Sequence, residues 1–356
     1  LPKAKKRGIK TSCWLEDVWR NDVAGVDQVQ EIDLYGRRRS QLCMNHPDHQ
    51  NFLTAIVEDY TRSYDIDGIM WGSERHGALG TALGANHGGK GSDPGRVGCF
   101  CSFCEKKAKA RGIDVSRAKE GFRTLERFVR DGRGGRRPVD GYFVTFLRIA
   151  MRYPEIFAWE QFWHDSLREN YERMYKKVKS IKPGVQVGWH IWHNNSFSPF
   201  YRAQQDLKEL SRYSDFLKIV MYHNCGGERM AGYIESVQAH LYGDLSLQEA
   251  LDFHYRVMNY REGSYDRIPF TGLSADYVYR ETKRAVEGAA GTKTLIWPGI
   301  DIDIPTNLKH SRTTPQGVRD AVLAALRGGA HGVLLSRKYS EMRLGNLSGA
   351  GEALKR

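Results

Sequence analysis

Three cysteines are spaced closely enough to bind one metal ion together. Cys99, Cys101 and Cys104 form a C-x-C-x-x-C pattern in a segment that we expect to be a loop leading into a helix over residues 105–111. Thiolates are soft ligands, and a structural zinc site holds four protein ligands in a tetrahedral arrangement. The pattern therefore predicts a structural zinc ion that needs one further ligand from elsewhere in the chain.

Cys43 is the natural fourth ligand of this site. It lies in the segment Cys43-Met44-Asn45-His46-Pro47, where a helix begins before the next predicted strand, and we expect the fold to bring it near the loop that follows that strand. His76 and His87 offer imidazole alternatives to Cys43. A closed set of four ligands leaves no open position, so we expect a structural zinc loop at residues 86–111, remote from any substrate.

Two carboxyl groups follow predicted strands and could perform acid-base and nucleophilic chemistry. Glu74 follows an apolar run over residues 66–71, and Asp301 follows a run over residues 294–300. Hydrolysis of a glycosidic bond uses one carboxyl group to protonate the leaving oxygen and a second to attack or to activate water. We predict Glu74 as the general acid/base and Asp301 as the nucleophile. Asp303 and Glu341 compete with Asp301 for the second role.

Aromatic and polar side chains also occur at the ends of the predicted strands. Five of the eight tryptophans lie at or beside the ends of predicted strands, where a flat apolar ring could stack on the C–H face of a sugar. We therefore expect an oligosaccharide or glycoside as the substrate. The predicted substrate-binding residues are Trp14, Glu16, Trp71, His190, Trp192, Asn194, Tyr222, Trp297, Asp303, Tyr339 and Glu341.

Short apolar runs alternate with longer helical patterns, which is typical of repeated βα units and a parallel sheet. Because no Gly-rich phosphate loop follows the first run, the pattern favours a single α/β domain over residues 1–356 with the (β/α)₈ TIM-barrel fold. Two strands are missing from the count, and we expect two βα units to lie upstream or to be irregular. The predicted strands cover residues 9–15, 66–71, 185–192, 216–222, 294–300 and 332–336, and the predicted helices begin at Pro47 and Pro154 and cover residues 203–212, 247–260, 275–287 and 315–327.

The order of these features resembles the central part of glycoside hydrolase family 42. The resemblance rests on residues 40–110: Cys-Met-Asn-His-Pro, a helix, a strand followed by Glu74, and then C-x-C-x-x-C. It implies a β-galactosidase-like retaining enzyme with a structural zinc site, whose catalytic glutamates follow the fourth and seventh barrel strands. This chain has Ser73 where the family has an asparagine before the acid/base, and Asp301 where it has a glutamate. These departures point to a relative of the clan with a different sugar specificity.

Composition narrows the choice of partners. The 356 residues carry a net charge of +12, but the basic residues occur in short clusters without a nucleic-acid-binding signature, which favours a solvated surface over a nucleic-acid partner. No apolar stretch is long enough for a membrane helix, and the first residues lack a signal-peptide core, so we expect a soluble chain without a membrane partner. Assembly into a homo-oligomer stays open.

Two further interpretations compete with the glycosidase. In the first, His190, His193 and Asp301 hold a catalytic metal in a metal-dependent barrel hydrolase. In the second, the chain is a non-catalytic carbohydrate-binding barrel that keeps the tryptophans and lacks a working second carboxylate.

Overall fold

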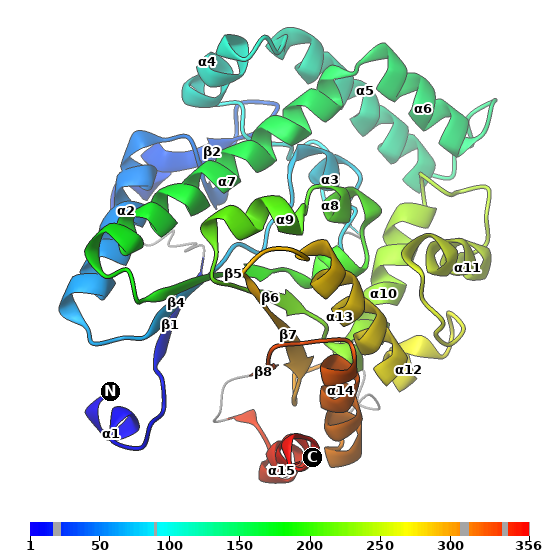
Figure 1. The fold of residues 1–356 in the computed structure, drawn as a ribbon. Helices are drawn as coiled ribbons and strands as arrows, with labels where there is room; N and C mark the ends of the chain where they lie inside the picture. The colour runs from blue at the N-terminus through cyan, green and yellow to red at the C-terminus, as the bar shows by residue number, and fades with distance from the viewer. Residues whose placement is uncertain (17–22, 89–90, 307–312, 337–340, 356) are drawn as a thin grey trace. The chain divides into compact units, whose positions relative to one another are not determined.

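The computed structural model describes residues 1–16, 23–88, 91–306, 313–336 and 341–355 (Figure 1). These residues divide into two compact units. The first comprises Leu1–Ala85, Gly91–Gly188 and Ala239–Asp244, and the second comprises Asn86–Lys90, Trp189–Gln238 and Leu245–Arg356. Strand β5 carries the chain from the first unit into the second.

All six predicted strands are present, and they form one sheet in the order β1-β4-β5-β6-β7-β8. The pairings β1–β4, β6–β7 and β7–β8 are parallel. The prediction of a parallel α/β barrel is thereby confirmed as a partial, six-stranded barrel. The strands are β1 (Ser12–Glu16), β4 (Gly68–Gly72), β5 (Gln186–Ile191), β6 (Phe216–Val220), β7 (Leu295–Asp301) and β8 (Leu334–Ser336).

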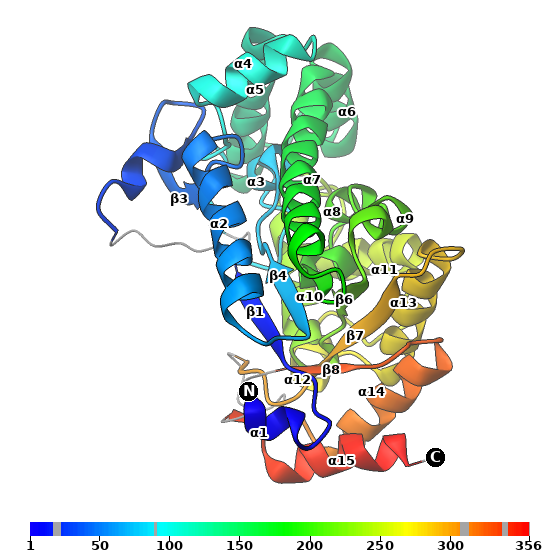
Figure 2. The same ribbon diagram turned by 60° about the vertical axis from the view of Figure 1, so that its left-hand side comes forward.

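Helices of the first unit begin where the sequence places helix-start signals. Helix α2 has Pro47 in its first turn, and the His46 side chain accepts a hydrogen bond from the Asp48 N–H. The long helix α7 follows Pro154 and packs against α2, as Figure 2 shows. The elements of this unit besides its strands in the main sheet are α1 (Pro2–Lys5), η1 (Val26–Val29), β2 (Gln30–Ile32), β3 (Arg38–Leu42), α2 (Pro47–Ser63), α3 (Ala78–Ala82), α4 (Ser102–Ala110), α5 (Val115–Arg133), α6 (Tyr142–Arg152) and α7 (Glu155–Ile181).

Four of these elements, two strands and two helices, extend the sequence-based prediction. The antiparallel hairpin β2–β3 and the helices α5 and α6 lie in segments for which we predicted no structure. Helix α5 has a recognisable start, because the Asp114 carboxylate accepts hydrogen bonds from the N–H groups of Ser116 and Arg117. Its apolar face packs against both α6 and α7.

Helices of the second unit alternate with β6, β7 and β8 as the βα pattern requires. Helix α10 begins at His223, directly after β6, and was not predicted; α11, α13 and α14 match predicted helices. Helices α14 and α15 pack together near the C-terminal end of the described chain (Figure 1). The elements are η2 (His193–Ser196), α8 (Pro199–Ala203), α9 (Leu207–Leu210), η3 (Ser211–Tyr213), α10 (His223–Gln238), α11 (Leu247–Met258), α12 (Ile268–Thr271), α13 (Ala275–Gly288), α14 (Pro315–Arg327) and α15 (Leu344–Leu354).

Among the helices that the structure describes, none combines the length and the apolar character that crossing a membrane requires.

Candidate functional site

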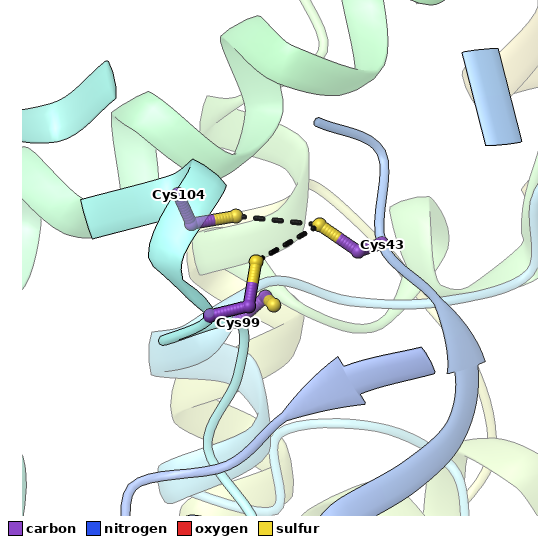
Figure 3. A group of neighbouring side chains, drawn as sticks. Cys43, Cys99 and Cys104 are labelled. Atoms are coloured by element: carbon purple, nitrogen blue, oxygen red, sulfur yellow. Dashed lines mark hydrogen bonds between the residues drawn. The ribbon is translucent and has the colours of Figure 1, made fainter. Parts of the chain in front are cut away.

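The four cysteines of the predicted metal site meet in the first unit. Their sulfur atoms all lie within 4.8 Å of one another, and the Cys43 sulfur is 3.5 Å from those of Cys101 and Cys104. Four thiolates at about 2.3 Å from a tetrahedral zinc would lie about 3.8 Å apart. Figure 3 shows Cys43 reaching from the segment after β3 toward Cys104 on α4, with Cys99 beside them. The arrangement fits a metal such as zinc.

Donors around the cluster suit thiolate ligands. The N–H groups of Ile32 and Asn45 donate to the sulfurs of Cys99 and Cys43 at 3.4 Å each, and the Asn45 side-chain amide donates to the Cys104 sulfur at 3.3 Å. Lys107 in turn donates to the Asn45 carbonyl oxygen at 2.7 Å and so fixes the orientation of the amide. Such partners hold metal ligands in place, and N–H donors favour the charged sulfur.

The thiols also share protons unequally. Hydrogen bonds from Cys104 and Cys43 hold the pKa of the Cys101 thiol well below its ordinary value. Burial raises the pKa of Cys99, and the hydrogen bond to Cys101 raises that of Cys104. A cation bound among the four sulfurs would favour the thiolate form of each of them.

The two histidine alternatives do not belong to this cluster. Over the part of the chain that the structure describes, the group of potential metal ligands contains the four cysteines and neither histidine. His76 is half-buried near Glu160 and Arg39, and desolvation of its ring lowers its pKa to about 4. His87 belongs to the second unit, where its ring contacts Trp192 and Phe197. Cys43 is thus the fourth candidate ligand.

Glu74 follows β4 on a segment that buried charges hold in place. Its side chain is exposed, whereas its neighbour Arg75 is buried and points away into the unit, donating to the Leu42 carbonyl at 2.8 Å and lying 3.6 Å from the Glu31 carboxylate. A few residues later, the Leu79 N–H donates to Glu160 on α7 at 2.7 Å. The segment that carries the predicted acid is therefore anchored on its C-terminal side, at Arg75 and at Leu79.

Asp301 is the last residue of β7 and is completely buried. Its Oδ2 accepts a 2.8 Å hydrogen bond from the Cys225 N–H, and its Oδ1 accepts one of 3.1 Å from the Ile304 N–H. Burial raises the pKa of this carboxyl, against the opposing influence of His223 and the two N–H donors. The carboxylate joins the end of β7 to the start of α10.

The two competing carboxylates have different surroundings. Asp303 has a left-handed backbone with φ 61°, and its carboxylate accepts hydrogen bonds from the Arg343 backbone and side chain and from Asn346. The Arg343 guanidinium thereby contributes to a lowered pKa of Asp303, although partial burial opposes it. Glu341 is exposed. Asp303 ties α15 to the segment after β7.

The predicted substrate-binding residues have several different environments. Trp14 and Glu16 lie on β1 and are exposed. Trp297 stacks on Phe216 with ring centroids 4.2 Å apart, and Tyr222 donates to Ser336 at 2.9 Å. The remaining described ones are buried: Trp71, His190, Trp192 and Asn194. Tyr339 lies outside the described residues.

His193 lies in a chain of buried hydrogen bonds that the sequence did not reveal. Arg229 lies 3.1 Å from its Nδ1, and its Nε2 lies 3.1 Å from the Tyr277 hydroxyl, which donates to Ser196 at 2.7 Å. Both ring nitrogens are therefore engaged by protein groups. In the described ranges, His190, His193 and Asp301 do not appear as a group that could hold a metal. The geometry does not assemble the catalytic metal site of a metal-dependent barrel hydrolase.

Two buried glutamates, one in each unit, were also missed. Glu160 on α7 and Glu281 on α13 lie in amphipathic helical patterns, where a single acidic residue among apolar ones is the signal that could have identified them. Glu281 binds Arg202 at 2.7 Å and Arg284 at 3.0 Å. These two charges lower its pKa to about 2, although burial opposes the shift.

Comparisons with known proteins bear on the fold. Neither the protein-family models nor the sequences of curated proteins give a match. Among solved structures, this chain is similar to a β-galactosidase from the Antarctic haloarchaeon Halorubrum lacusprofundi, at 14% identity and a TM-score of 0.53, and to one from the psychrophilic Marinomonas ef1, at 10% and 0.52. An α-L-fucosidase, isoenzyme 2 from Paenibacillus thiaminolyticus, matches at 15% and 0.46.

Each match covers 99% of this chain but only part of the other protein, namely 49%, 50% and 38% in the same order. At these identities the similarity shows the architecture alone. The partial barrel is of the kind found in glycoside hydrolases, in agreement with the resemblance to β-galactosidase-like enzymes stated from the sequence.

Proposed function

We propose that this chain forms the barrel of a glycoside hydrolase that cleaves a carbohydrate substrate with two carboxyl groups and retention of configuration. One observation carries the proposal: an exposed glutamate, Glu74, follows directly on a parallel strand of a barrel that two β-galactosidases share. Active sites of such barrels are built where the parallel strands end. The sugar and the linkage are left to experiment.

Glu74 is the proposed general acid/base. A general acid must reach the glycosidic oxygen, and the exposure of this side chain gives a substrate access to it. The anchoring of the segment through Arg75 and through Glu160 supports the role, because a positioned acid transfers its proton more effectively than a mobile one.

Asp301 is the proposed nucleophile. It is placed on the end of a barrel strand and oriented by the N–H groups of Cys225 and Ile304, which supports a role that needs a fixed carboxylate. Attack on an anomeric carbon also requires contact with the sugar, and in this structure Asp301 is fully covered. The proposal therefore includes an opening of this cover when substrate binds.

The same burial favours a second candidate, a carbohydrate-binding barrel without hydrolytic activity. In this candidate Asp301 and Asp303 are structural, one joining β7 to α10 and the other binding Arg343. Glu74 would then contact a sugar hydroxyl. The two candidates differ in whether any glycoside is turned over.

The test is a screen of aryl glycosides with the wild-type protein, Glu74→Gln and a surface control, Asp48→Asn. If Glu74 is the acid, Glu74→Gln loses activity on substrates with poor leaving groups by about 10²- to 10⁴-fold and far less on activated ones, whereas Asp48→Asn keeps both. Equal losses on both substrate types would remove Glu74 from this role. Sugar binding without turnover of any substrate would support the second candidate.

The nucleophile is tested by chemical rescue. Azide added to Asp301→Ala should restore turnover of an activated glycoside and give a glycosyl azide of inverted configuration. Rescue of Asp303→Ala or Glu341→Ala instead would move the assignment to that residue. If all three variants bind sugar and none is rescued, a covalent mechanism is excluded.

We also propose that the four-cysteine cluster holds a structural zinc ion. The closed set of four sulfurs leaves no position for a substrate, and the surrounding N–H donors are those expected of a thiolate site. The ion would join the hairpin β2–β3 and the segment before α4, and so stabilise the first unit.

A further inference from the structure

Helix α6 is apolar around most of its circumference, although only one side of it is covered within the first unit. Its buried residues Tyr142, Phe146 and Ile149 face α5, where Tyr142 contacts Phe128 edge to face. Successive side chains of a helix are about 100° apart, so the polar residues Thr145, Arg148 and Arg152 occupy a sector of only about 60°. A helix with so narrow a polar sector is normally buried on more than one side.

The more exposed side of α6 carries a continuous apolar patch, in which Phe143 is partly covered by Tyr242, with ring centroids 6.3 Å apart. Phe143, Leu147 and Met151 are four residues apart and therefore lie within a stripe about 80° wide, with Val144 at its edge. We call these four residues and Val139, in the preceding loop, the α6 patch. Their exposed fractions are 96% for Val139, 48% for Phe143, 49% for Val144, 43% for Leu147 and 81% for Met151.

The size of the α6 patch matches one half of a small protein interface. With roughly 150–200 Å² for each fully exposed side chain, these fractions amount to about 500 Å² of apolar surface. The largest apolar patch of a monomer is typically about 300–600 Å² and is often functional, so this patch lies in the upper part of that range. Two such patches facing each other bury about 1,000 Å², which is near the lower limit of a specific interface.

We propose that the α6 patch is the contact between two copies of this chain, related by a two-fold axis that passes beside Leu147. The spacing of the stripe is self-complementary, because Phe143 and Met151 lie equally far on either side of Leu147. In an antiparallel pair of α6 helices, Phe143 of one copy therefore meets Met151 of the other, and the two Leu147 side chains meet at the axis. A thioether against an aromatic ring is a favourable contact.

Charges beside the α6 patch favour a second protein over an anionic lipid surface. Three nearby arginines are already paired with carboxylates: Arg148 with Asp140, Arg137 with Asp244, and Arg136 with Asp131. An anionic membrane attracts cations that are not neutralised in this way. On the helix, Arg148 points about 100° away from Leu147, so a dimer does not bring the two copies of Arg148 together at its centre.

The first experiment measures the molar mass of the whole chain by light scattering over a wide range of concentration. We expect a dimer for the wild type, and a monomer for Leu147→Glu and for Met151→Glu. The unfolding midpoint of each variant should equal that of the wild type at concentrations low enough for the wild type to dissociate, because association itself stabilises the folded dimer. The matched control is Val257→Glu, on α11 of the second unit, where the side chain is 51% exposed and outside the patch. It should remain dimeric.

A monomeric wild type, or a dimer that survives both substitutions in α6, overturns the proposal. Vesicles containing phosphatidylglycerol test the alternative that the α6 patch binds a membrane. If the wild type is monomeric and binds these vesicles, and Met151→Glu abolishes the binding, the patch is assigned to lipid instead.

A second experiment tests the symmetry. Under mild oxidation, Leu147→Cys should form a disulfide-linked dimer by itself. Phe143→Cys and Met151→Cys should link efficiently only when the two variants are mixed. Efficient self-linking of Phe143→Cys with none for Leu147→Cys would exclude the proposed axis.

Discussion

The Cys225 N–H donates a 2.8 Å hydrogen bond to Oδ2 of Asp301, so the start of α10 is joined to the end of β7 through a fully buried carboxylate. The burial that fixes this carboxylate in place also keeps it from contacting a substrate, as the proposed nucleophile must. The N–H donors around it stabilise the charged carboxylate, whereas burial disfavours the charge and raises the pKa of Asp301.

The first prediction concerns the pH dependence of stability at Asp301. For an acid whose pKa is higher in the folded protein than in the unfolded chain, the folded state loses stability as pH rises from the unfolded value, about 3.9, through the folded one. Each unit of difference corresponds to about 1.4 kcal/mol. Asp301→Asn removes this titration, so the stability of the wild type relative to the variant should fall as pH increases across that window.

Denaturant unfolding at a series of pH values measures this difference, with Asp48→Asn as an exposed control whose relative stability changes little. A wild type that gains stability relative to Asp301→Asn as pH rises would show that the N–H donors outweigh burial.

The second prediction concerns the cysteine cluster. Protein purified without chelator should contain about one zinc ion per chain, as a closed tetrahedral thiolate site implies. Cys104→Ser should lose the metal and unfold at lower denaturant concentration, since metal binding to such a site contributes directly to folding. Cys13→Ser is the matched control, because Cys13 lies on β1 outside the cluster and its substitution leaves the metal bound.

Elemental analysis and a thiol titration distinguish the outcomes. The metal site would be refuted if the protein contained no metal, were fully stable and had four cluster thiols that titrate readily.

The third prediction concerns the ion pairs of Glu281. This buried carboxylate binds Arg202 and Arg284, and Glu281→Gln would leave the largely buried Arg202 without its charged partner. Loss of one partner of a buried pair costs about 3–5 kcal/mol, so we expect a decrease of this order in the free energy of unfolding at pH 7. Glu287→Gln, whose carboxylate is exposed, should change it by less than about 0.5 kcal/mol.

The sign of the pH dependence provides a second check. The Glu281 pKa is lowered to about 2, so its contribution is present above the unfolded value of about 4.3 and is lost as pH falls toward 2. The difference between the wild type and Glu281→Gln should therefore shrink in acid. A difference independent of pH would mean that the charge of Glu281 is not what stabilises the fold.

The fourth prediction concerns the close approach of Gly77 to Glu160. A β-carbon at Gly77 would collide with the Glu160 carboxylate, which is buried and accepts hydrogen bonds from the Leu79 N–H and His164. Gly77→Ala should therefore lower the free energy of unfolding by about 1–3 kcal/mol. Gly184→Ala, where a β-carbon meets nothing within 4 Å, should have a neutral or slightly stabilising effect.

Thermal unfolding of both variants provides the comparison. The same measurement on Glu160→Ala and on the double variant Gly77→Ala/Glu160→Ala should show that the two losses of stability are not additive. The reason is that Glu160→Ala removes the group with which the β-carbon at position 77 collides.

Local sequence determined the strands and much of the cysteine cluster of this protein. Runs such as 216–222 and 294–300 are apolar enough to be buried on both faces, and that property already selects a parallel strand. The spacing of Cys99, Cys101 and Cys104 allows one ion to contact all three, because residues so close in sequence stay close in space. The start of α2 at Pro47 likewise depends only on its neighbours.

The tertiary structure decided the roles of the charged side chains. Asp301 and Asp303 look alike in sequence, but the first accepts N–H bonds from α10 and the second binds Arg343, and these partners lie 76 and 40 residues away in the chain. Cys43, and not His76, is the fourth candidate metal ligand because the segment after β3 lies beside α4. The hydrogen bond from the Leu79 N–H to Glu160 and the ion pair of Glu281 with Arg202 likewise join segments far apart in the chain. Electrostatic environments depend on which distant segments pack together, and no local pattern encodes that choice.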